Sequence, residues 1–455
     1  MRRLLAGIAA VAIGISATPG LAQEKLVVWW EKGFSKAEDD ALLAVVRKYE
    51  ARTGVKVDLA WHAAQEMIPK VTAALDAGAL PDIAYADAFN LQTAGRWAFE
   101  SKLEDISDVV APIKHRFAPN TVEAAFLANG KTGKRAYYAF PLKQQTLHIQ
   151  YWKDILAVAG FKENDIPGAW REYWAFWCDK VQPAWRVSAG QGVFGVGSPM
   201  GVDSVDSYKS FLAWVDAFDA KLVDDSGKVL VDDAKVRQGL IDALRGYTDL
   251  YTKGCTPAQS TGWKDGDNDS AFNGRTVAMT PNSSLSVVGK WLDDANNDRL
   301  GAQQRAQGRK AYDELIATAG LPRKPGGAPM LSRADVKLGA IFQASRNKTH
   351  ARDFLKLLME EDNLRPYVES ALGRWFPVTK EGQKSVFWQA DRQRKSVHDQ
   401  FMAGTTLFEF TWNYRFAALN IENVWAKAMH RVVNDKLPVD KAVDELIARI
   451  KEVAG

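Results

Sequence analysis

The sequence predicts an α/β fold made of more than one compact unit, and three observations lead to this prediction. Short apolar runs alternate with amphipathic helical segments over residues 25–86, which is the β-α-β-α-β order of a parallel sheet. A chain of 455 residues with 47% hydrophobic content can bury a large core and exceeds the usual size of one domain. A strand-like stretch at residues 136–152 carries more hydrogen-bonding side chains than a buried strand needs.

Residues 1–22 are predicted to be a secretory signal peptide. Two arginines precede an apolar run from Leu4 to Ile15, and small residues stand before a cleavage point at Ala22. The mature chain is expected to begin near Gln23. It is expected to be soluble, because no later apolar stretch approaches the about 20 residues that cross a bilayer.

The first sheet begins with a predicted strand over residues 25–30. Ser35 and Glu38 form a capping box for a helix that ends at Gly54. Strands over 55–61 and 82–86 flank a second helix over 66–76. Ligands of parallel sheets bind beyond the carboxyl ends of the strands. Those ends carry Trp29, Trp30, Glu31, Trp61, His62, Asp87, Phe89 and Asn90.

The polar stretch at 136–152 is predicted to pass from one lobe to another along a cleft. Phe140 and Pro141 approach the first hinge, and either Gln144 or Gln145 is offered to a ligand where the lobes meet, because neighbouring strand residues face opposite ways. His148 lies about 13 Å further along such a strand, so it is read as an interior histidine.

Helical character rises after this stretch. An aromatic helical face is read as core rather than as a ligand-stacking row, and it comprises Trp170, Tyr173, Trp174, Trp177 and Val181. The remaining expected elements are helices over 208–218 and 236–251, a strand and polar loop within 273–284, a connector over 321–329, a strand over 336–343, a crossing over 371–378 and a closing helix around 443–450.

Composition narrows the function classes. Without Arg2 and Arg3 the chain has 57 basic and 55 acidic residues, so its formal charge of +2 gives no electrostatic case for nucleic acid. Most of the 16 tryptophans must be core, although such rings also stack on the apolar faces of sugars. Cys178 and Cys255 could form a disulfide in an oxidising compartment or remain two buried thiols.

The candidate motifs for catalysis or cofactor binding lack residues or neighbouring elements that each motif requires. The glycines of residues 190–195 do not open a helix, and residues 130–132 lack the first glycine of a phosphate loop. The acids of residues 265–269 lack the glycine and glutamate of a calcium loop, so they are read as a solvated loop. Six histidines are scattered without a metal-binding pair. No catalytic residue, metal or cofactor is therefore predicted, although two carboxylates of a glycosidase would leave no motif.

The order and spacing of several segments resemble the extracellular solute-binding proteins, family 1, that serve carbohydrate ABC importers. These segments are the export signal and residues 26–31, 49–57, 77–86, 139–141, 151–160, 167–174, 271–279 and 373–379. The resemblance implies a periplasmic binding protein fold: two α/β lobes joined by hinge crossings, with a ligand cleft between them. It also implies that the protein is a periplasmic monomer without catalytic activity, and that its partners are a small-molecule carbohydrate and the permease subunits of the importer.

The resemblance also implies lobe boundaries and ligand positions. Lobe 1 would comprise residues 23–142 plus about 330–373, and lobe 2 residues 143–329 plus about 374–455. The ligand positions fall on Trp30, Glu31, His62, Asp87, Gln144, Gln145, Trp263, Asn282, Ser283, Gly373, Arg374, Trp375 and Trp412.

The chemistry of this set favours an uncharged sugar, oligosaccharide or polyol, because carboxylates and amides bond hydroxyls while tryptophan rings stack on apolar faces. Two alternatives remain open at this point. Arg374 could instead select a charged solute such as glycerol phosphate or a sugar acid, and a polyamine is a further charged candidate. The second alternative is a secreted glycan-degrading enzyme.

Overall fold

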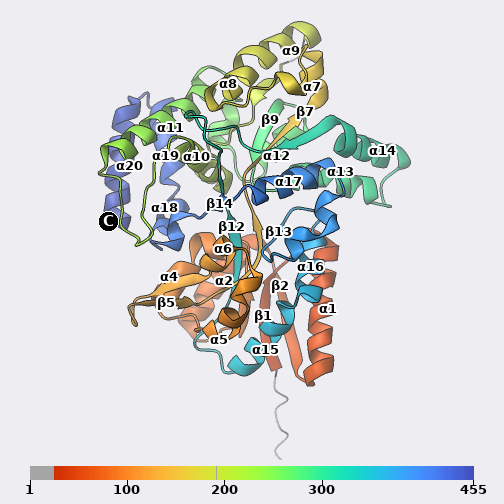
Figure 1. The fold of residues 1–455 in the computed structure, drawn as a ribbon, viewed down its shortest axis with the longest axis vertical. Coiled ribbons are helices and arrows are strands. Elements are labelled where there is room, and N and C mark those ends of the chain that lie inside the picture. Colours follow the sequence, from red (N-terminus) through yellow and green to blue (C-terminus); the bar gives the residue numbers. More distant parts are fainter. Residues whose placement is uncertain (1–24, 191) are drawn as a thin grey trace, which may run out of the picture.

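The structure is a computed structural model that describes residues 25–190 and 192–455. The predicted signal peptide and the start near Gln23 lie outside the described residues. Figure 1 shows two lobes stacked along the long axis of the molecule, and each lobe has its own hydrophobic core. We call the lobe that contains the N-terminal strands lobe 1 and the other lobe 2.

Lobe 1 is built on a six-stranded sheet in the order β13-β6-β12-β3-β1-β2. Strands β1, β2 and β3 pair in parallel, which confirms the predicted β-α-β-α-β start. Strand β12 runs antiparallel to both β3 and β6, and β13 runs antiparallel to β6. The strands are β1 (Lys25–Glu31), β2 (Lys56–His62), β3 (Ile83–Tyr85), β6 (Phe140–Gln145), β12 (Asp335–Ile341) and β13 (Phe376–Pro377).

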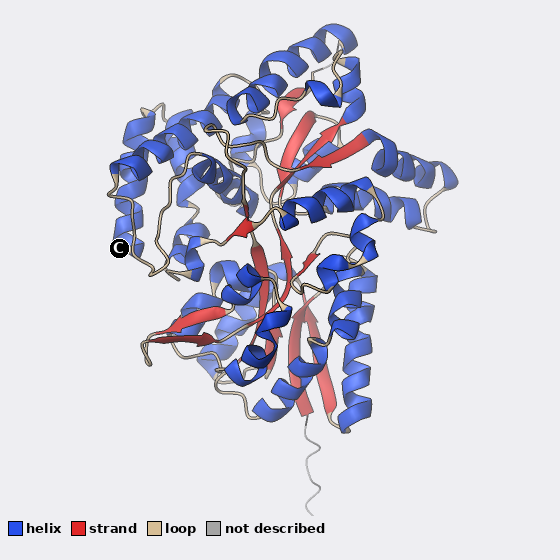
Figure 2. Ribbon diagram, in the orientation of Figure 1, coloured by secondary structure: helices blue, strands red, loops and turns tan. Residues whose placement is uncertain are grey.

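Helices cover this sheet, and a two-stranded hairpin extends from its side (Figure 2). In the first helix Ser35 accepts a hydrogen bond from the Glu38 N–H, and Gly54 ends the helix in the left-handed conformation at φ 76°. The elements are α1 (Lys36–Thr53), α2 (Ala64–Ala77), α3 (Phe89–Gln92), α4 (Ala94–Phe99), α5 (Ser107–Val110), α6 (Pro119–Glu123), β4 (Phe126–Asn129), β5 (Lys134–Tyr137), α15 (Lys348–Leu358) and α16 (Glu361–Glu369).

Lobe 2 has a four-stranded sheet in the order β10-β7-β9-β8 and is richer in helices. Its strands are β7 (His148–Trp152), β8 (Phe194–Val196), β9 (Val277–Asn282) and β10 (Ile316–Ala319). Its helices are α7 (Lys153–Val158), α8 (Trp170–Ala175), α9 (Gln182–Ala189), α10 (Val205–Ala217), α11 (Ala234–Thr252), α12 (Asp267–Asn273), α13 (Ser286–Asn296), α14 (Ala302–Lys310), α17 (Arg392–Met402), α18 (Phe416–Glu422), α19 (Val424–Val433) and α20 (Val439–Ala454).

The aromatic row that begins in α8 lies in the core of lobe 2, as predicted, and both Trp170 and Trp177 are fully buried. Cys178 and Cys255 form a disulfide in the structure. This bond ties the segment that follows α8 to the chain just after α11.

The chain crosses between the lobes three times. Strand β6 stays in the lobe 1 sheet through Gln145 and β7 joins the lobe 2 sheet, so the first crossing lies at Thr146 and Leu147. The second follows β10 and reaches β12, through a connector without helix or strand at residues 324–331. The third follows β13, whose Phe376 already packs in the core of lobe 2.

A further two-stranded sheet lies along the second crossing, where β11 (Ser332–Arg333) pairs in parallel with β14 (Thr405–Thr406) of lobe 2. Within residues 25–190 and 192–455, no helix combines the length and apolar character that a membrane span requires.

Candidate ligand site between the lobes

A cavity of about 400 Å³ lies between the lobes, beyond the carboxyl ends of β1 and β3. Both lobes contribute to its wall, and most of the lining residues are polar or charged. It is lined by Glu31, Ala64, Asp87, Ala88, Leu91, Gln145, Val205, Asp206, Lys209, Asp265, Gly266, Asp269, Asn282, Ser283, Ser284, Ser286, Lys337, Arg374 and Trp375. The position agrees with the general rule for ligands of parallel sheets.

Seven of the predicted ligand residues line this cavity. They are Glu31, Asp87, Gln145, Asn282, Ser283, Arg374 and Trp375. They come from strand ends in both lobes and from the turn that precedes β13, so segments far apart in the sequence meet at one place.

The structure does not bring Trp30 and Gln144 to the cavity. Trp30 is fully buried, stacks on Tyr85 with ring centroids 4.6 Å apart and donates its Nε1–H to the Tyr367 hydroxyl at 3.1 Å. Gln144 donates to the Pro377 carbonyl at 2.8 Å. In both cases the neighbour in the sequence, Glu31 or Gln145, faces the cavity instead, as strand alternation requires.

Four other predicted residues also lie off the cavity wall. His62 is beside Lys70, whose Nζ lies 3.1 Å from its Nδ1, and Trp263 belongs to the core of lobe 2. Gly373 forms a turn at φ 94° against Leu285 and Arg394. Trp412 lines a separate cavity of about 460 Å³, where the Arg135 guanidinium lies 5.1 Å from its ring.

Two carboxylates define the lobe 1 side of the cavity. Glu31 Oε2 accepts a hydrogen bond from the Asp87 N–H at 3.0 Å, and burial together with the nearby Asp87 charge raises the pKa of Glu31 to about 7. Burial opposes ionisation of Asp87 as well, but Lys143, Lys337 and Arg374 outweigh it and lower the pKa of Asp87. Asp87 is therefore ionised at neutral pH, whereas Glu31 titrates there.

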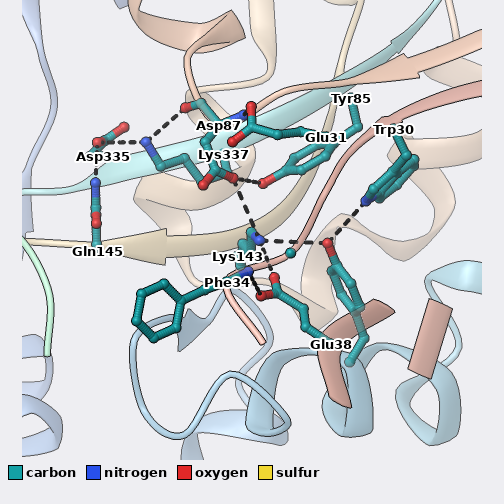
Figure 3. A network of polar contacts seen from close by, with 12 residues as sticks. Trp30, Glu31, Phe34, Glu38, Tyr85, Asp87, Lys143, Gln145, Asp335 and Lys337 are labelled. Atoms are coloured by element: carbon teal, nitrogen blue, oxygen red, sulfur yellow. Dashed lines mark hydrogen bonds and ion pairs between the residues drawn. The ribbon is translucent and has the colours of Figure 1, made fainter. Parts of the chain in front are cut away.

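Asp335 lies below the cavity wall and accepts hydrogen bonds from four donors, and Figure 3 shows two of them, Lys337 and Gln145. The distances to its oxygens are 2.6 Å from Lys209 Nζ, 2.8 Å from Lys337 Nζ, 2.8 Å from Gln145 Nε2 and 2.6 Å from Asn90 Nδ2. Burial acts against the charge, but the two lysines hold the pKa of Asp335 well below its usual range. Since Lys209 belongs to lobe 2, this carboxylate joins the lobes.

The lobe 2 side of the cavity contains the acidic segment that the sequence suggested was a solvated loop. That reading is wrong for Asp269, which is half-buried and accepts hydrogen bonds from Asn282 and from the Ser286 hydroxyl. Asp265 accepts from the Val205 N–H at 2.6 Å, at the start of α10. Burial and the neighbouring acids raise the pKa of Asp269 to about 7 and that of Asp206 to about 6.

Carboxylates outnumber cations on the cavity wall. Five acids line it against Lys209, Lys337 and Arg374. Asp335 already pairs with both lysines, and Arg374 makes no ion pair with a described residue. Its guanidinium lies between two rings, 4.5 Å from the centroid of Phe34 and 4.9 Å from that of Trp375. Such a wall presents charged hydrogen-bond acceptors and donors together.

Within residues 25–190 and 192–455, no group of three or more histidine, cysteine, aspartate or glutamate side chains is placed so that it could hold a metal ion. Trp375 is the one aromatic side chain on the cavity wall. The wall therefore suits a ligand that is held mainly by hydrogen bonds.

Sequence reasoning missed the buried lysines of this region. Lys143, Lys209 and Lys337 are each at most 9% exposed. A charged residue between apolar neighbours was an available signal for Lys337, which stands between Val336 and Leu338, because lysine is almost never fully buried without a partner. Lys143 precedes Gln144 and Lys209 precedes Ser210, so the sequence offers no such signal for them. The partners are distant in the sequence and become visible only in the fold.

The chain is similar to a known protein family and to several solved structures. A family model described as bacterial extracellular solute-binding protein matches residues 44–396. No curated protein matches the chain.

Solved structures similar to the chain include an ABC transporter solute-binding protein from Thermotoga lettingae bound with α-D-tagatose. Its identity is 18% and its TM-score 0.72, with 95% of this chain and 100% of that chain covered. A maltose-bound protein of T. maritima has 18% identity and a TM-score of 0.70, with 94% and 99% covered. The sugar-binding protein MalE from Xanthomonas citri has 19% identity and a TM-score of 0.70, with 94% and 97% covered. Identities this low show the fold alone, and it is the predicted two-lobed α/β fold.

Proposed function

The chain belongs to the bacterial extracellular solute-binding proteins, which bind solutes for ABC transporters and are not catalytic, and from this premise we propose that it captures a sugar, oligosaccharide or polyol between its lobes. The captured ligand is then delivered to the permease subunits of an ABC importer. Because the family is non-catalytic, the glycan-degrading alternative does not apply to this chain.

One observation carries the proposal: the cavity between the lobes offers hydroxyl-binding groups from both sides. Glu31, Asp87 and Gln145 come from lobe 1 and the segment that leaves it, while Asn282 and Ser283 come from lobe 2. A polyhydroxylated ligand both donates to carboxylates and accepts from amides and hydroxyls, so it can satisfy both walls at once. The solved sugar-bound relatives with the same fold support this ligand class.

The size and lining of the cavity favour a short ligand. A space of about 400 Å³ lies at the lower end of the range for small-molecule sites. The aromatic residue of the cavity wall, Trp375, is 2% exposed and its ring lies 4.3 Å from Lys143 Nζ and 4.9 Å from the Arg374 guanidinium, so little aromatic surface is free to stack on a sugar face. A monosaccharide, disaccharide or polyol therefore fits this proposal better than a long chain.

The remaining parts of the proposal follow from the sequence. The protein acts in the periplasm as a monomer after a signal peptide is removed near Ala22, and it needs no cofactor. Its two lobes close over the ligand by bending at the three crossings, at Thr146 and Leu147, at residues 324–331 and after β13, so the first and third boundaries lie a few residues later than the predicted 142/143 and 373/374. The six predicted residues that lie off the cavity are left out of the proposed ligand set.

A cationic solute is the second candidate, and the charge of the wall favours it over an anionic one. Glu31, Asp206, Asp265 and Asp269 have no ion-pair partner among the described residues, whereas Arg374 is the one such cation on the wall. An added phosphate or carboxylate would face these four acids, while an amine would complement them. Glycerol phosphate and sugar acids therefore become less favoured than a polyamine or an amine-bearing sugar.

A thermal-shift panel tests the proposal. It contains D-tagatose, maltose, laminaribiose, sorbitol, glucosamine, glucuronate, glycerol phosphate and spermidine. A neutral sugar or polyol at 100 times its dissociation constant is expected to stabilise the protein by about 2.7 kcal/mol. For two lobes that unfold together, with an unfolding entropy of about 2.1 cal/mol/K per residue, this corresponds to a midpoint increase of roughly 3 °C.

The panel also separates the alternatives. An increase in the midpoint with spermidine alone would favour a cationic solute over a sugar as the ligand. An increase with glycerol phosphate or glucuronate alone would contradict the argument that the charge of the wall disfavours anions. If no member changes the midpoint, the proposed ligand class is rejected.

A further inference from the structure

Lys143 lies directly behind the lobe 1 wall of the cavity without lining it. Its side chain is 2% exposed, and its Nζ is 2.5 Å from Glu38 Oε1 and 3.5 Å from Asp87 Oδ1. One of these carboxylates belongs to the first turn of α1, and the other lines the cavity. A buried ammonium group thus connects the ligand wall to the start of a helix (Figure 3).

Aromatic rings complete the surroundings of this ammonium group. Lys143 Nζ lies 4.3 Å from the ring centroid of Trp375, 5.2 Å from that of Tyr85 and 5.3 Å from that of Tyr367. Cation–π attraction at these distances is strongest where water is excluded. Trp375 is the aromatic residue of the cavity wall, so Lys143 contacts a second wall residue besides Asp87.

Glu38 extends the connection to a third wall residue. Its Oε2 accepts a hydrogen bond from the Phe34 N–H at 3.0 Å, and the Phe34 ring lies 4.5 Å from the Arg374 guanidinium. Phe34 itself is 48% exposed, so burial alone does not fix its position. The hydrogen bond to Glu38, which pairs with Lys143, holds the backbone from which this ring projects.

We propose that Lys143 is a positioning residue for ligand capture. It holds Asp87 and Trp375 directly, and Arg374 through Glu38 and Phe34, in the arrangement that the ligand meets. This inference rests on the proposed function of the cavity. It also gives a reason for a charge in the core, because replacing a buried ion pair by apolar residues often leaves stability unchanged or improves it.

The charged groups around Lys143 explain what its removal would change. Glu38, Asp87 and, further away, Glu31 attract the ammonium group, and the Tyr367 hydroxyl lies 3.5 Å from its Nζ. Lys337 and Arg374 share its influence on Asp87, to which the Tyr85 hydroxyl donates a hydrogen bond. Burial raises the pKa of Asp87, and Lys143 is one of the three cations that lower it. Without Lys143 the pKa of Asp87 would therefore rise. The ionised form of Asp87 would then be less strongly favoured, and the wall would lose its fixed geometry.

The test variant is Lys143→Met combined with Glu38→Gln, which removes the cation and its closest anion together and so avoids leaving a lone buried charge. The matched control is Arg352→Met combined with Glu104→Gln, another ion pair of lobe 1 that lies off the cavity. D-tagatose, maltose and laminaribiose are titrated calorimetrically into each protein. For the tightest-binding sugar, the dissociation constant is expected to rise at least tenfold in the test variant and less than twofold in the control.

A second measurement needs no ligand. The carboxyl ¹³C resonance of Asp87, assigned by its loss in Asp87→Asn, is titrated in wild type and in the test variant. The midpoint is expected to move to higher pH in the variant, a result that a purely structural role for Lys143 does not predict. If the double variant does not fold, Lys143→Gln with Glu38→Gln takes its place.

Equal affinity in the test variant and the control, or an unmoved Asp87 midpoint, would overturn the inference while the proposed function stands. If none of the three sugars nor any other member of the thermal-shift panel binds the wild-type protein, the proposed function fails instead. In that case the Asp87 titration alone still decides whether Lys143 controls the wall.

Discussion

Glu31 and Asp269 lie on opposite lobes, but both are carboxylates whose surroundings disfavour the ionised form. Neither has an ion-pair partner in the described residues, and burial raises the pKa of each to about 7. Their hydrogen bonds come from a backbone N–H in one case and from amide and hydroxyl groups in the other. In the ligand-free protein each ionised carboxylate is therefore costly, and hydroxyl groups of a bound ligand would reduce that cost.

Replacing Glu31 by Gln is expected to separate stability from binding. The pKa of Glu31 is about 7 in the folded protein against 4.5 as its ordinary value, so its favourable contribution is complete below pH 4.5 and is lost as the pH rises through 7. At pH 8 the variant should therefore be more stable than wild type by about 1–3 kcal/mol. The affinity for the sugar should fall roughly tenfold, because a charged hydrogen-bond acceptor is lost.

Urea denaturation at pH 8 and pH 5 measures this difference in stability, and calorimetric titration measures the affinity. The stability gain should shrink at pH 5, where wild-type Glu31 is mostly protonated. A variant that loses stability at pH 8 would contradict the assigned environment of Glu31.

Individual residues show where sequence reasoning reached the site and where it could not. The strand-end rule found Glu31 and Asp87, since it needs only the order of elements. The rule could not predict that Trp30 faces the core rather than the ligand. Its indole N–H donates to the hydroxyl of Tyr367, which is 337 residues away in the sequence. The same holds for Lys143 and Lys209, whose partners lie 105 and 126 residues away.

Strand β6 illustrates the same limit at the scale of an element. Its polar run was predicted to leave lobe 1 after residue 142, yet pairing continues to Gln145 because Asp335 of β12 stands opposite it. On the other edge Gln144 stands opposite Phe376 of β13. Each polar side chain of the strand has a partner that is distant in the sequence. The composition therefore predicted an unusually polar strand but could not predict the residue at which it ends.

The disulfide offers a prediction about lobe 2 alone. It closes a segment of 77 residues between Cys178 and Cys255, and a loop of that length corresponds to about 4 kcal/mol in the chain-entropy account. Replacing both cysteines by serine should lower the free energy of unfolding by about that amount or less. Neither cysteine lines the ligand cavity, so the affinity for the sugar should not change.

Urea denaturation and calorimetric titration of the double serine variant check both statements, with wild type under reducing conditions as a second comparison. A large loss of affinity with intact folding would show that the disulfide supports the cavity as well as lobe 2.

The two lobes were predictable at the scale of the whole molecule, because alternating strands and helices and the order of family-like segments are properties of the chain as a whole. The contacts that hold the lobes together could not be predicted from the sequence. Asp335 starts β12 of lobe 1 and binds Lys209 of α10 in lobe 2, and the sequence marks neither residue as part of an interface. The contact exists because two distant segments meet below the cavity.

Replacing Asp335 by Asn is therefore expected to weaken the connection between the lobes. Lys209 and Lys337 would lose their shared buried anion, at a cost of about 3–5 kcal/mol. Burial already lowers the pKa of Lys337 even though Asp335 opposes this shift, so without Asp335 it would lose its proton more readily. The destabilisation should consequently be smaller at pH 9 than at pH 7. Differential scanning calorimetry at both pH values should resolve separate transitions for the lobes in the variant, whereas one transition with an unchanged midpoint would show that other contacts hold the lobes together.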